Sequence, residues 1–138
     1  MTDRYLLDTC AVIWLMGGDD IEDNALKQLA EAQSAEGLVS ISAMTAWEIG
    51  MLASKNRLAS TRHPLRWFKD AVGQFGADVE EVSPDVLVAS SFLPAPIHND
   101  PMDRILIATA RERDLTIVTR DRAILSYGAL GHVKTLPC

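Results

Sequence analysis

Short apolar runs alternate with longer runs of helical spacing along the whole chain. The short runs are rich in leucine, isoleucine and valine, as buried strands are, and we expect strands at residues 4–8, 38–41, 79–82, 116–119 and 133–135. In the longer runs apolar residues recur with helical periodicity, and we expect helices at residues 9–16, 24–35, 43–53, 64–75, 85–91, 103–113 and 122–126. Strands that alternate with helices predict an α/β fold in which helices cover a mainly parallel sheet.

Turn and capping residues separate these elements. Gly17 and Gly18 follow the first predicted helix, where glycine commonly ends a helix. Ser42 stands at the N-cap position of the helix at residues 43–53, and Pro64 stands in a first turn, where proline is tolerated. Residues 93–101 contain three prolines, which predicts an irregular loop before the helix that Asp103 opens.

Length and composition predict a single domain over residues 1–138. The chain is 48% hydrophobic, which suffices for a substantial core, and it contains no repeat or linker. Its first residues lack the pattern of a signal peptide, and the longest apolar run, residues 10–16, is far shorter than the ~20 residues that span a bilayer. Cys10 and Cys138 have no metal-ligand spacing. We therefore expect a cytoplasmic protein with reduced thiols and no membrane contact.

The net charge of −6 argues against a protein that coats nucleic acid without specificity, because binding to a polyanion usually leaves a basic surface. Five basic residues nevertheless fall within residues 55–69, with no acidic residue among them. This basic stretch could form a locally positive face, or it could be an ordinary solvated helix surface. The sequence leaves both interpretations open.

Acidic residues stand at positions that core packing does not explain: Asp8, Glu48, Asp100, Asp103 and Asp121. Asp8 and Asp121 stand at the carboxyl ends of predicted strands, where ligands of open α/β sheets bind. The helices that carry Glu48 and Asp103 can reach the same edge. Converging carboxylates raise each other's pKa, and hard divalent cations with oxygen ligands relieve this repulsion. The pattern therefore predicts a magnesium or manganese site.

Each acidic residue also has a purely structural interpretation. Asp8 and Asp121 could be helix N-caps, Asp103 could interact with Arg104 or with the helix dipole, and Glu48 could be an exposed helix charge. Asp100 precedes a proline and could be a turn residue. Four such coincidences at one predicted sheet edge make the metal site the stronger interpretation.

Other kinds of site lack support in the sequence. His63, His98 and His132 share no spacing with the cysteines, so a zinc site is not expected. The glycine-rich phosphate loops and the serine-hydrolase elbow are absent as well. The three tryptophans, flanked by apolar positions of helical spacing, are predicted to lie in the core rather than to stack on bases; they are Trp14, Trp47 and Trp67.

Four sequence blocks together resemble a PIN domain, and more narrowly the VapC-like toxin half of a bacterial toxin–antitoxin pair. The blocks are YLLDT at residues 5–9, WEI at residues 47–49, DPMDRILIATA at residues 100–110 and TRD at residues 119–121. Their order and spacing match over nearly the whole chain. This resemblance implies a three-layer α/β/α sandwich around a mainly parallel sheet.

The resemblance also implies the site and its chemistry. The acidic quartet that holds Mg²⁺ or Mn²⁺ would be Asp8, Glu48, Asp103 and Asp121, with supporting roles for Thr9, Asp100 and Thr119. The implied activity is endonucleolytic hydrolysis of RNA by a metal-activated water, which leaves 5′-phosphate and 3′-hydroxyl ends. The implied partners are a cognate antitoxin protein, the RNA substrate and a second copy of the chain in a homodimer.

Two alternatives remain open at this stage. The chain could be a catalytically silent PIN-like interaction module, because carboxylates alone do not prove metal binding. It could also be a phosphatase or a receiver-like domain, since both use aspartates at strand ends. A phosphatase of the haloacid-dehalogenase type would have a second aspartate where Cys10 stands, which disfavours that alternative.

Overall fold

The computed structural model describes residues 3–97 and 99–138, so His98 lies outside the described residues. In the described part of the chain, five strands form one sheet in the order β3-β2-β1-β4-β5, and each neighbouring pair is parallel. The strands are β1 (Tyr5–Leu7), β2 (Val39–Ser42), β3 (Asp78–Glu80), β4 (Thr116–Thr119) and β5 (Lys134–Pro137). The predicted mainly parallel sheet is confirmed.

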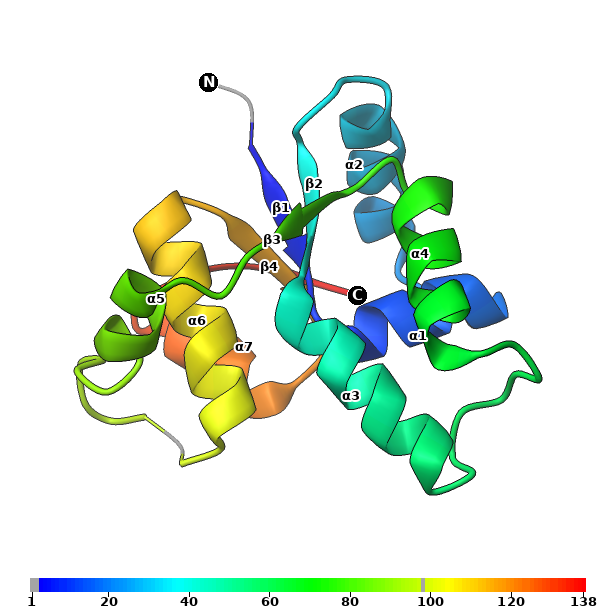
Figure 1. Ribbon diagram of the computed structural model, residues 1–138. Coiled ribbons are helices and arrows are strands. Elements are labelled where there is room, and N and C mark those ends of the chain that lie inside the picture. The colour runs from blue at the N-terminus through cyan, green and yellow to red at the C-terminus, as the bar shows by residue number, and fades with distance from the viewer. Residues whose placement is uncertain (1–2, 98) are drawn as a thin grey trace.

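Helices connect these strands and cover both faces of the sheet (Figure 1). They are α1 (Thr9–Gly17), α2 (Asp23–Gln33), α3 (Ala43–Ser54), α4 (Pro64–Gln74), α5 (Pro84–Ala89), α6 (Pro101–Arg113) and α7 (Arg122–Ala129). In Figure 1, α1 to α4 lie on one side of the sheet and α5 to α7 on the other. The predicted three-layer α/β/α architecture is therefore confirmed.

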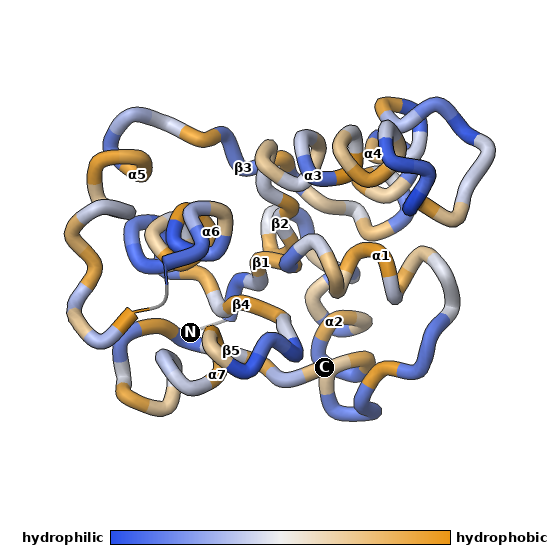
Figure 2. The backbone as a smooth tube through the Cα atoms, turned by 90° about the horizontal axis from the view of Figure 1, so that it is seen from below, coloured by the Kyte–Doolittle hydropathy of each residue, from blue (hydrophilic) through white to orange (hydrophobic). Residues whose placement is uncertain are grey.

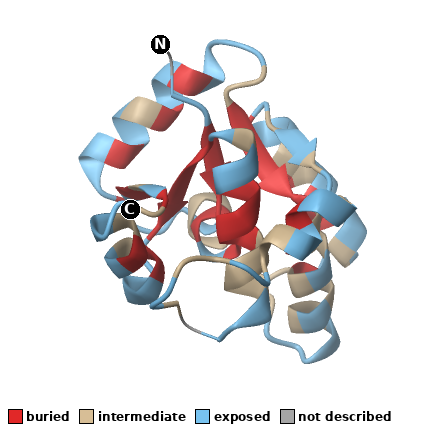
Figure 3. Ribbon diagram, turned by 90° about the vertical axis from the view of Figure 1, so that its left-hand side faces the viewer, coloured by how far each residue is buried: buried red, intermediate tan, exposed pale blue. Residues whose placement is uncertain are grey.

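The central strand β1 shows how one sheet serves two cores. Tyr5 and Leu7 belong to the cluster formed with α1 to α4, whereas Leu6 belongs to the cluster formed with α6 and α7. Successive side chains of a strand point to opposite faces, so a strand that is buried on both sides is apolar throughout. Figure 3 shows the central strands buried along their length, and the exposed residues gather on the outer helix faces and connections.

Several element boundaries differ from the sequence-based expectation. Helix α6 begins at Pro101 rather than Asp103, because Asp100 is its N-cap and proline fits the first helical position. Strand β3 spans Asp78–Glu80 rather than residues 79–82. Helix α7 continues to Ala129, beyond the predicted residue 126, because its later turn buries Tyr127 in the second core.

Hydropathy along the backbone follows the same plan. In Figure 2 the tube is hydrophobic along β1 and β4 and hydrophilic in the connection between α1 and α2. Within the described residues, no helix combines the length and apolar character that a membrane crossing needs.

The strand order fixes where a ligand site belongs. The chain runs outward from β1 to β2 and β3, and then returns to β4 on the other side of β1. The switch point of the sheet therefore lies between β1 and β4, and such points hold ligands at the carboxyl ends of the strands. Leu7 pairs with Val118 in register, so Asp8, which follows β1, lies next to Thr119, the last residue of β4.

Candidate active site

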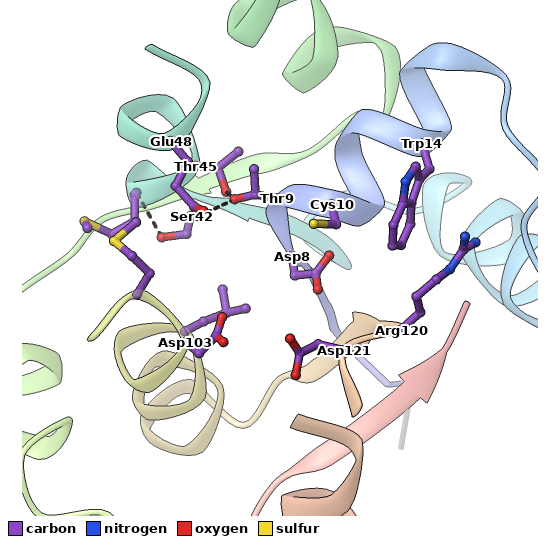
Figure 4. Close-up of a pocket in the computed structure, with 13 residues that line it drawn as sticks. Asp8, Thr9, Cys10, Trp14, Ser42, Thr45, Glu48, Asp103, Arg120 and Asp121 are labelled. Carbon is purple, nitrogen blue, oxygen red and sulfur yellow. Dashed lines mark hydrogen bonds between the residues drawn. The ribbon is translucent and has the colours of Figure 1, made fainter. Parts of the chain in front are cut away.

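A pocket of about 270 Å³ opens at this switch point (Figure 4). All four residues of the predicted acidic quartet line it, and each comes from a different part of the fold. Asp8 follows β1, Glu48 lies in α3, Asp103 lies in the first turn of α6, and Asp121 precedes α7. The topology thus brings together carboxylates that are up to 113 positions apart in the sequence (121 − 8).

Asp8 is the most enclosed of the four, with 7% of its surface exposed. One carboxylate oxygen, Oδ1, accepts the Ala11 N–H at 2.7 Å and so caps α1, while Oδ2 accepts the Thr119 hydroxyl. Burial raises the pKa of Asp8, and the nearby charge of Asp121 raises it further, although the hydrogen bonds from Thr119 and Ala11 oppose the shift. The N-cap interpretation of Asp8 is therefore correct, and the same side chain also faces the pocket.

Thr119 ties the two strand-end aspartates together. Its hydroxyl donates to Asp8 and accepts the backbone N–H of Asp121 at 3.0 Å. Asp121 in turn caps α7, because its Oδ1 accepts the N–H of Ile124 at 3.0 Å. Thr119 is completely buried, so this arrangement is held rigidly at the end of β4.

Glu48 is held by a relay of two threonine hydroxyls. Thr9 donates to Glu48 Oε1 at 2.5 Å, and the Thr9 and Thr45 hydroxyl oxygens are 3.0 Å apart. A hydroxyl has one proton, so Thr9, which gives its proton to Glu48, must accept that of Thr45. Burial raises the pKa of Glu48, and the charges of Asp100 and Asp8 raise it further, against the hydrogen bond from Thr9.

The two acidic residues at the start of α6 differ in position. Asp103 is half-buried and lines the pocket. Asp100 is exposed and caps the helix, accepting the N–H groups of Met102 at 2.9 Å and Asp103 at 3.3 Å. Asp100 is not part of the pocket lining, but its charge acts on Glu48. A supporting position for Asp100, outside the quartet, fits this geometry.

The donor chemistry of the pocket fits a hard divalent cation, because its carboxylates and hydroxyls are the oxygen ligands that Mg²⁺ and Mn²⁺ take. In the described residues, however, no three His, Cys, Asp or Glu side chains are grouped closely enough to hold a metal ion as they stand. Carboxylates repel one another, so binding would require their side chains to rotate inward. The negative potential is also visible at Cys10, whose pKa is raised to about 11 by burial and by the charges of all four carboxylates.

Sequence analysis missed four of the pocket's polar or aromatic residues. Ser42 was predicted only as a helix cap, and Thr45 was not singled out, although Thr45 precedes Glu48 by three positions and so shares its helix face. Arg120 was not singled out either, although it lies between two predicted site residues in the TRD block. Trp14 was assigned to the core and does pack against the first core cluster, but it is half-buried and also lines the pocket.

The core prediction is confirmed for Trp67, which is 5% exposed, and in part for Trp14, which packs against the first core cluster. Trp47 is 55% exposed, because it projects from the outer face of α3 instead of the core face that carries Ile49. Within the basic stretch of residues 55–69, Arg62 and Arg66 both pair with Asp70 at 3.1 Å. For these two arginines the solvated-surface interpretation is the better description.

Comparisons with known proteins agree with this architecture. Residues 5–130 match the family model described as PIN domain. The chain is 27% identical over 124 residues to Ribonuclease VapC22 of Mycobacterium tuberculosis (strain ATCC 25618 / H37Rv), covering 88% of this chain and 90% of that protein.

Solved structures extend the agreement to the fold. VapBC2 from Rickettsia felis, bound to a DNA fragment from its promoter, superposes with a TM-score of 0.72 at 13% identity and covers 98% of both chains. DNA-bound VapBC from Salmonella typhimurium superposes with a TM-score of 0.69 at 16% identity, again over 98% of both chains. At such low sequence identities these structures support the fold alone. The family model matches residues 5–130 and therefore establishes the family. The chain belongs to the PIN-domain family.

Proposed function

We propose that this PIN-domain protein is a metal-dependent endoribonuclease that hydrolyses RNA to 5′-phosphate and 3′-hydroxyl ends. The observation that carries the proposal is the acidic quartet: four carboxylates from four separate elements line one pocket at the switch point of the sheet. The similarity to Ribonuclease VapC22 supports the choice of RNA as substrate.

In this proposal Asp8, Glu48, Asp103 and Asp121 hold Mg²⁺ or Mn²⁺. When bound, such an ion lowers the pKa of water and offsets the negative charge that develops on the phosphate. The protein's own part is positioning: Thr119 fixes Asp8, and Thr9 with Thr45 fixes Glu48. Attack by water, rather than by the neighbouring 2′-hydroxyl, is what leaves a 5′-phosphate.

Two of the four carboxylates are held differently. Glu48 accepts the Thr9 hydroxyl on Oε1, so its Oε2 is the oxygen better placed to bind the ion. Asp8 is more enclosed and accepts hydrogen bonds on both oxygens, so its position is fixed more firmly.

We further propose that the chain acts in the cytoplasm as the toxin of a toxin–antitoxin pair, works as a homodimer and is silenced by a cognate antitoxin protein. Supporting this, one solved structure of similar fold is a toxin–antitoxin complex from Klebsiella pneumoniae. The net charge of −6 and the acidic pocket favour an inhibitor that presents a basic side chain.

The test is cleavage of total RNA by the purified protein with Mn²⁺ or Mg²⁺, beside an EDTA control and the Asp103→Asn variant. We expect discrete fragments that vanish in both controls, and mapping of their ends gives both the end chemistry and the cleavage context. Persistent cleavage in EDTA or by Asp103→Asn would contradict a metal nuclease centred on the quartet.

The alternative is a silent PIN-like interaction module. It is favoured by one observation: no three acidic side chains of the described residues are grouped as a metal site. Calorimetric titration with Mn²⁺ separates the two. The nuclease requires saturable binding that Asp103→Asn weakens, whereas a silent module shows no saturable heat.

A further inference from the structure

A tryptophan and an arginine form the pocket edge that faces away from α6. The guanidinium carbon of Arg120 lies 3.7 Å from the centroid of the Trp14 ring, a cation–π contact. Both residues line the pocket that holds the acidic quartet. Trp14 belongs to α1, which directly follows Asp8, and Arg120 stands between β4 and Asp121. The contact between Trp14 and Arg120 therefore joins the two segments of the chain that carry these aspartates.

Arg120 is fixed in place on three sides. Besides the ring contact, its Nε donates to the Cys138 main-chain oxygen at 3.1 Å and its Nη2 donates to the Asp20 main-chain oxygen at 2.9 Å. In the part of the chain that the structure describes, no Asp or Glu carboxylate comes within 4.0 Å of this guanidinium. Main-chain oxygens hold the guanidinium in place, and its charge also acts on Asp8, where it opposes the rise in pKa.

The positive charge of Arg120 lies in a pocket whose carboxylates would repel a polyanion such as RNA. Of the described residues that line the pocket, Arg120 is the only basic one. A guanidinium binds phosphate oxygens well and is weakly hydrated, so it attracts an RNA backbone to an otherwise negative site.

The Trp14 ring offers the complementary surface. In Figure 4 the Arg120 guanidinium lies on one side of the ring, and Cys10 and Asp8 lie on the other. The cation thus covers one side of the ring, and the half-buried ring lines the pocket. An aromatic ring fixed beside a phosphate site is the arrangement on which unpaired bases stack.

We propose that Trp14 is a stacking platform for an unpaired base beside the cleaved phosphate, and that Arg120 is the positioning residue that orients the ring. This inference rests on the proposed nuclease function and makes it more specific. The pocket takes RNA whose base is turned out of any helix, and it discriminates between RNAs by the stacking strength of that base.

The first test is the dependence of the cleavage rate on RNA concentration for Trp14→Leu, Trp14→Phe and the control Trp47→Leu, which alters an exposed tryptophan outside the pocket. Loss of base stacking is expected to raise KM by roughly five- to a hundred-fold in Trp14→Leu, with a much smaller change in kcat. Trp14→Phe keeps a ring and should restore most of the loss, and Trp47→Leu should match the wild type.

Arg120→Lys keeps the charge but loses the planar contact and the fixed hydrogen bonds. It should raise KM in the same direction as Trp14→Leu and leave kcat nearly unchanged. A KM for Trp14→Leu equal to that of the wild type would overturn the platform and leave the nuclease standing. No cleavage by the wild type would overturn the proposed function itself, so the two failures are distinguishable.

A second measurement does not depend on turnover or on the Leu variant folding. The variant Trp47→Phe/Trp67→Phe retains Trp14 as the sole tryptophan of the three, and Asp103→Asn in the same chain prevents cleavage. Addition of a single-stranded RNA 12-mer of random sequence with Mg²⁺ should quench its fluorescence, and the same RNA annealed to its complements should quench it far less. Fluorescence anisotropy would confirm that the single-stranded RNA is bound. Tryptophan fluorescence that stays unchanged when this RNA is bound would overturn the stacking role.

Discussion

Asp8 and Asp85 occupy similar positions in the chain, each close to the start of a helix, but their surroundings are opposite. Asp8 is buried in the pocket among other carboxylates, and burial raises its pKa. Asp85 is exposed at the start of α5, where its hydrogen bonds with Arg113 and Ser83 lower its pKa. Arg113 compensates the charge of Asp85, whereas at Asp8 burial outweighs the hydrogen bonds and the charge of Arg120 that favour the ionised form.

The same contrast extends to the groups around each aspartate. Arg113 also pairs with Glu80 at 3.2 Å, so the surface cluster joins β3, α5 and α6 through one guanidinium. The pocket has only Arg120 among its described lining residues, and that side chain is committed to Trp14 and two carbonyls. The surface cluster neutralises its own charge, as a structural element does, whereas the acidic pocket does not, which agrees with the proposed metal site.

The largest effect that separates the two regions concerns cleavage. Asp103→Asn removes one charged oxygen ligand from the pocket and should reduce the rate of RNA cleavage by more than about a hundred-fold, since loss of even outer partners of metal sites costs about 10- to 100-fold. Asp85→Asn, a matched change in the surface cluster, should leave the rate within about two-fold, because Asp85 lies outside the pocket. Rates under saturating Mn²⁺, with thermal unfolding as the folding control, test this, and equal losses in both variants would break the comparison.

A smaller loss is expected when the support of the pocket is removed and its ligands are kept. Thr119→Val deletes the hydroxyl that donates to Asp8 and accepts the Asp121 N–H. We expect a loss in activity of roughly 10- to 100-fold and a decrease of about 1–3 kcal/mol in the free energy of unfolding, because buried polar groups lose partners.

The matched control is Thr109→Val. This hydroxyl is also buried, but it donates to the Ile105 carbonyl of its own helix at 2.8 Å and lies outside the pocket. Urea unfolding and cleavage assays on both variants should show a small stability change and normal cleavage for Thr109→Val. A similar activity loss in the control would mean that any buried threonine matters, and the specific role of Thr119 would be lost.

Much of this arrangement was visible in the sequence for a physical reason. Asp8 directly follows β1 and Asp121 comes two residues after the end of β4, so both must lie at the carboxyl edge of a parallel sheet, and their meeting follows from topology. Asp103 and Glu48 required the family resemblance as well, because a helix face is not fixed by sequence spacing alone. The fold class followed from the alternation of elements.

What the sequence did not reveal depends on contacts between distant segments. Trp14 has apolar helical neighbours, as a core residue does, and only the approach of Arg120 from the end of β4 makes it a pocket wall. Trp47 has similar neighbours and is exposed, because no described element covers its side of α3. Helical periodicity identifies an apolar position but not which elements pack against it.

A further prediction concerns how stability depends on pH, because the dependence should have opposite signs for Asp8 and Asp85. The pKa of Asp8 is raised in the folded state, so its ionised form destabilises the fold relative to its protonated form. Asp8 therefore contributes to the stability of the fold below its unfolded pKa near 4, and this contribution is lost as the pH rises through the raised pKa of the folded state. Asp8→Asn, which carries no charge, should therefore gain Tm relative to the wild type between about pH 4 and pH 8, while its cleavage activity is lost. A difference in Tm that stays constant or shrinks over this range would contradict the burial of an ionised Asp8.

The smallest expected effect has the opposite sign and comes from the surface cluster. The pKa of Asp85 is lowered by Arg113, so its contribution to stability is present above the unfolded pKa near 4 and is lost as the pH falls through the folded value. Asp85→Asn should consequently have a slightly lower Tm than the wild type at about pH 7, and the deficit should close in acid. Because Asp85 is exposed, added salt should also shrink the deficit. Thermal unfolding of both variants at several pH values then gives two difference curves of opposite slope, one for Asp85, which Arg113 compensates, and one for Asp8, which we propose as a metal ligand.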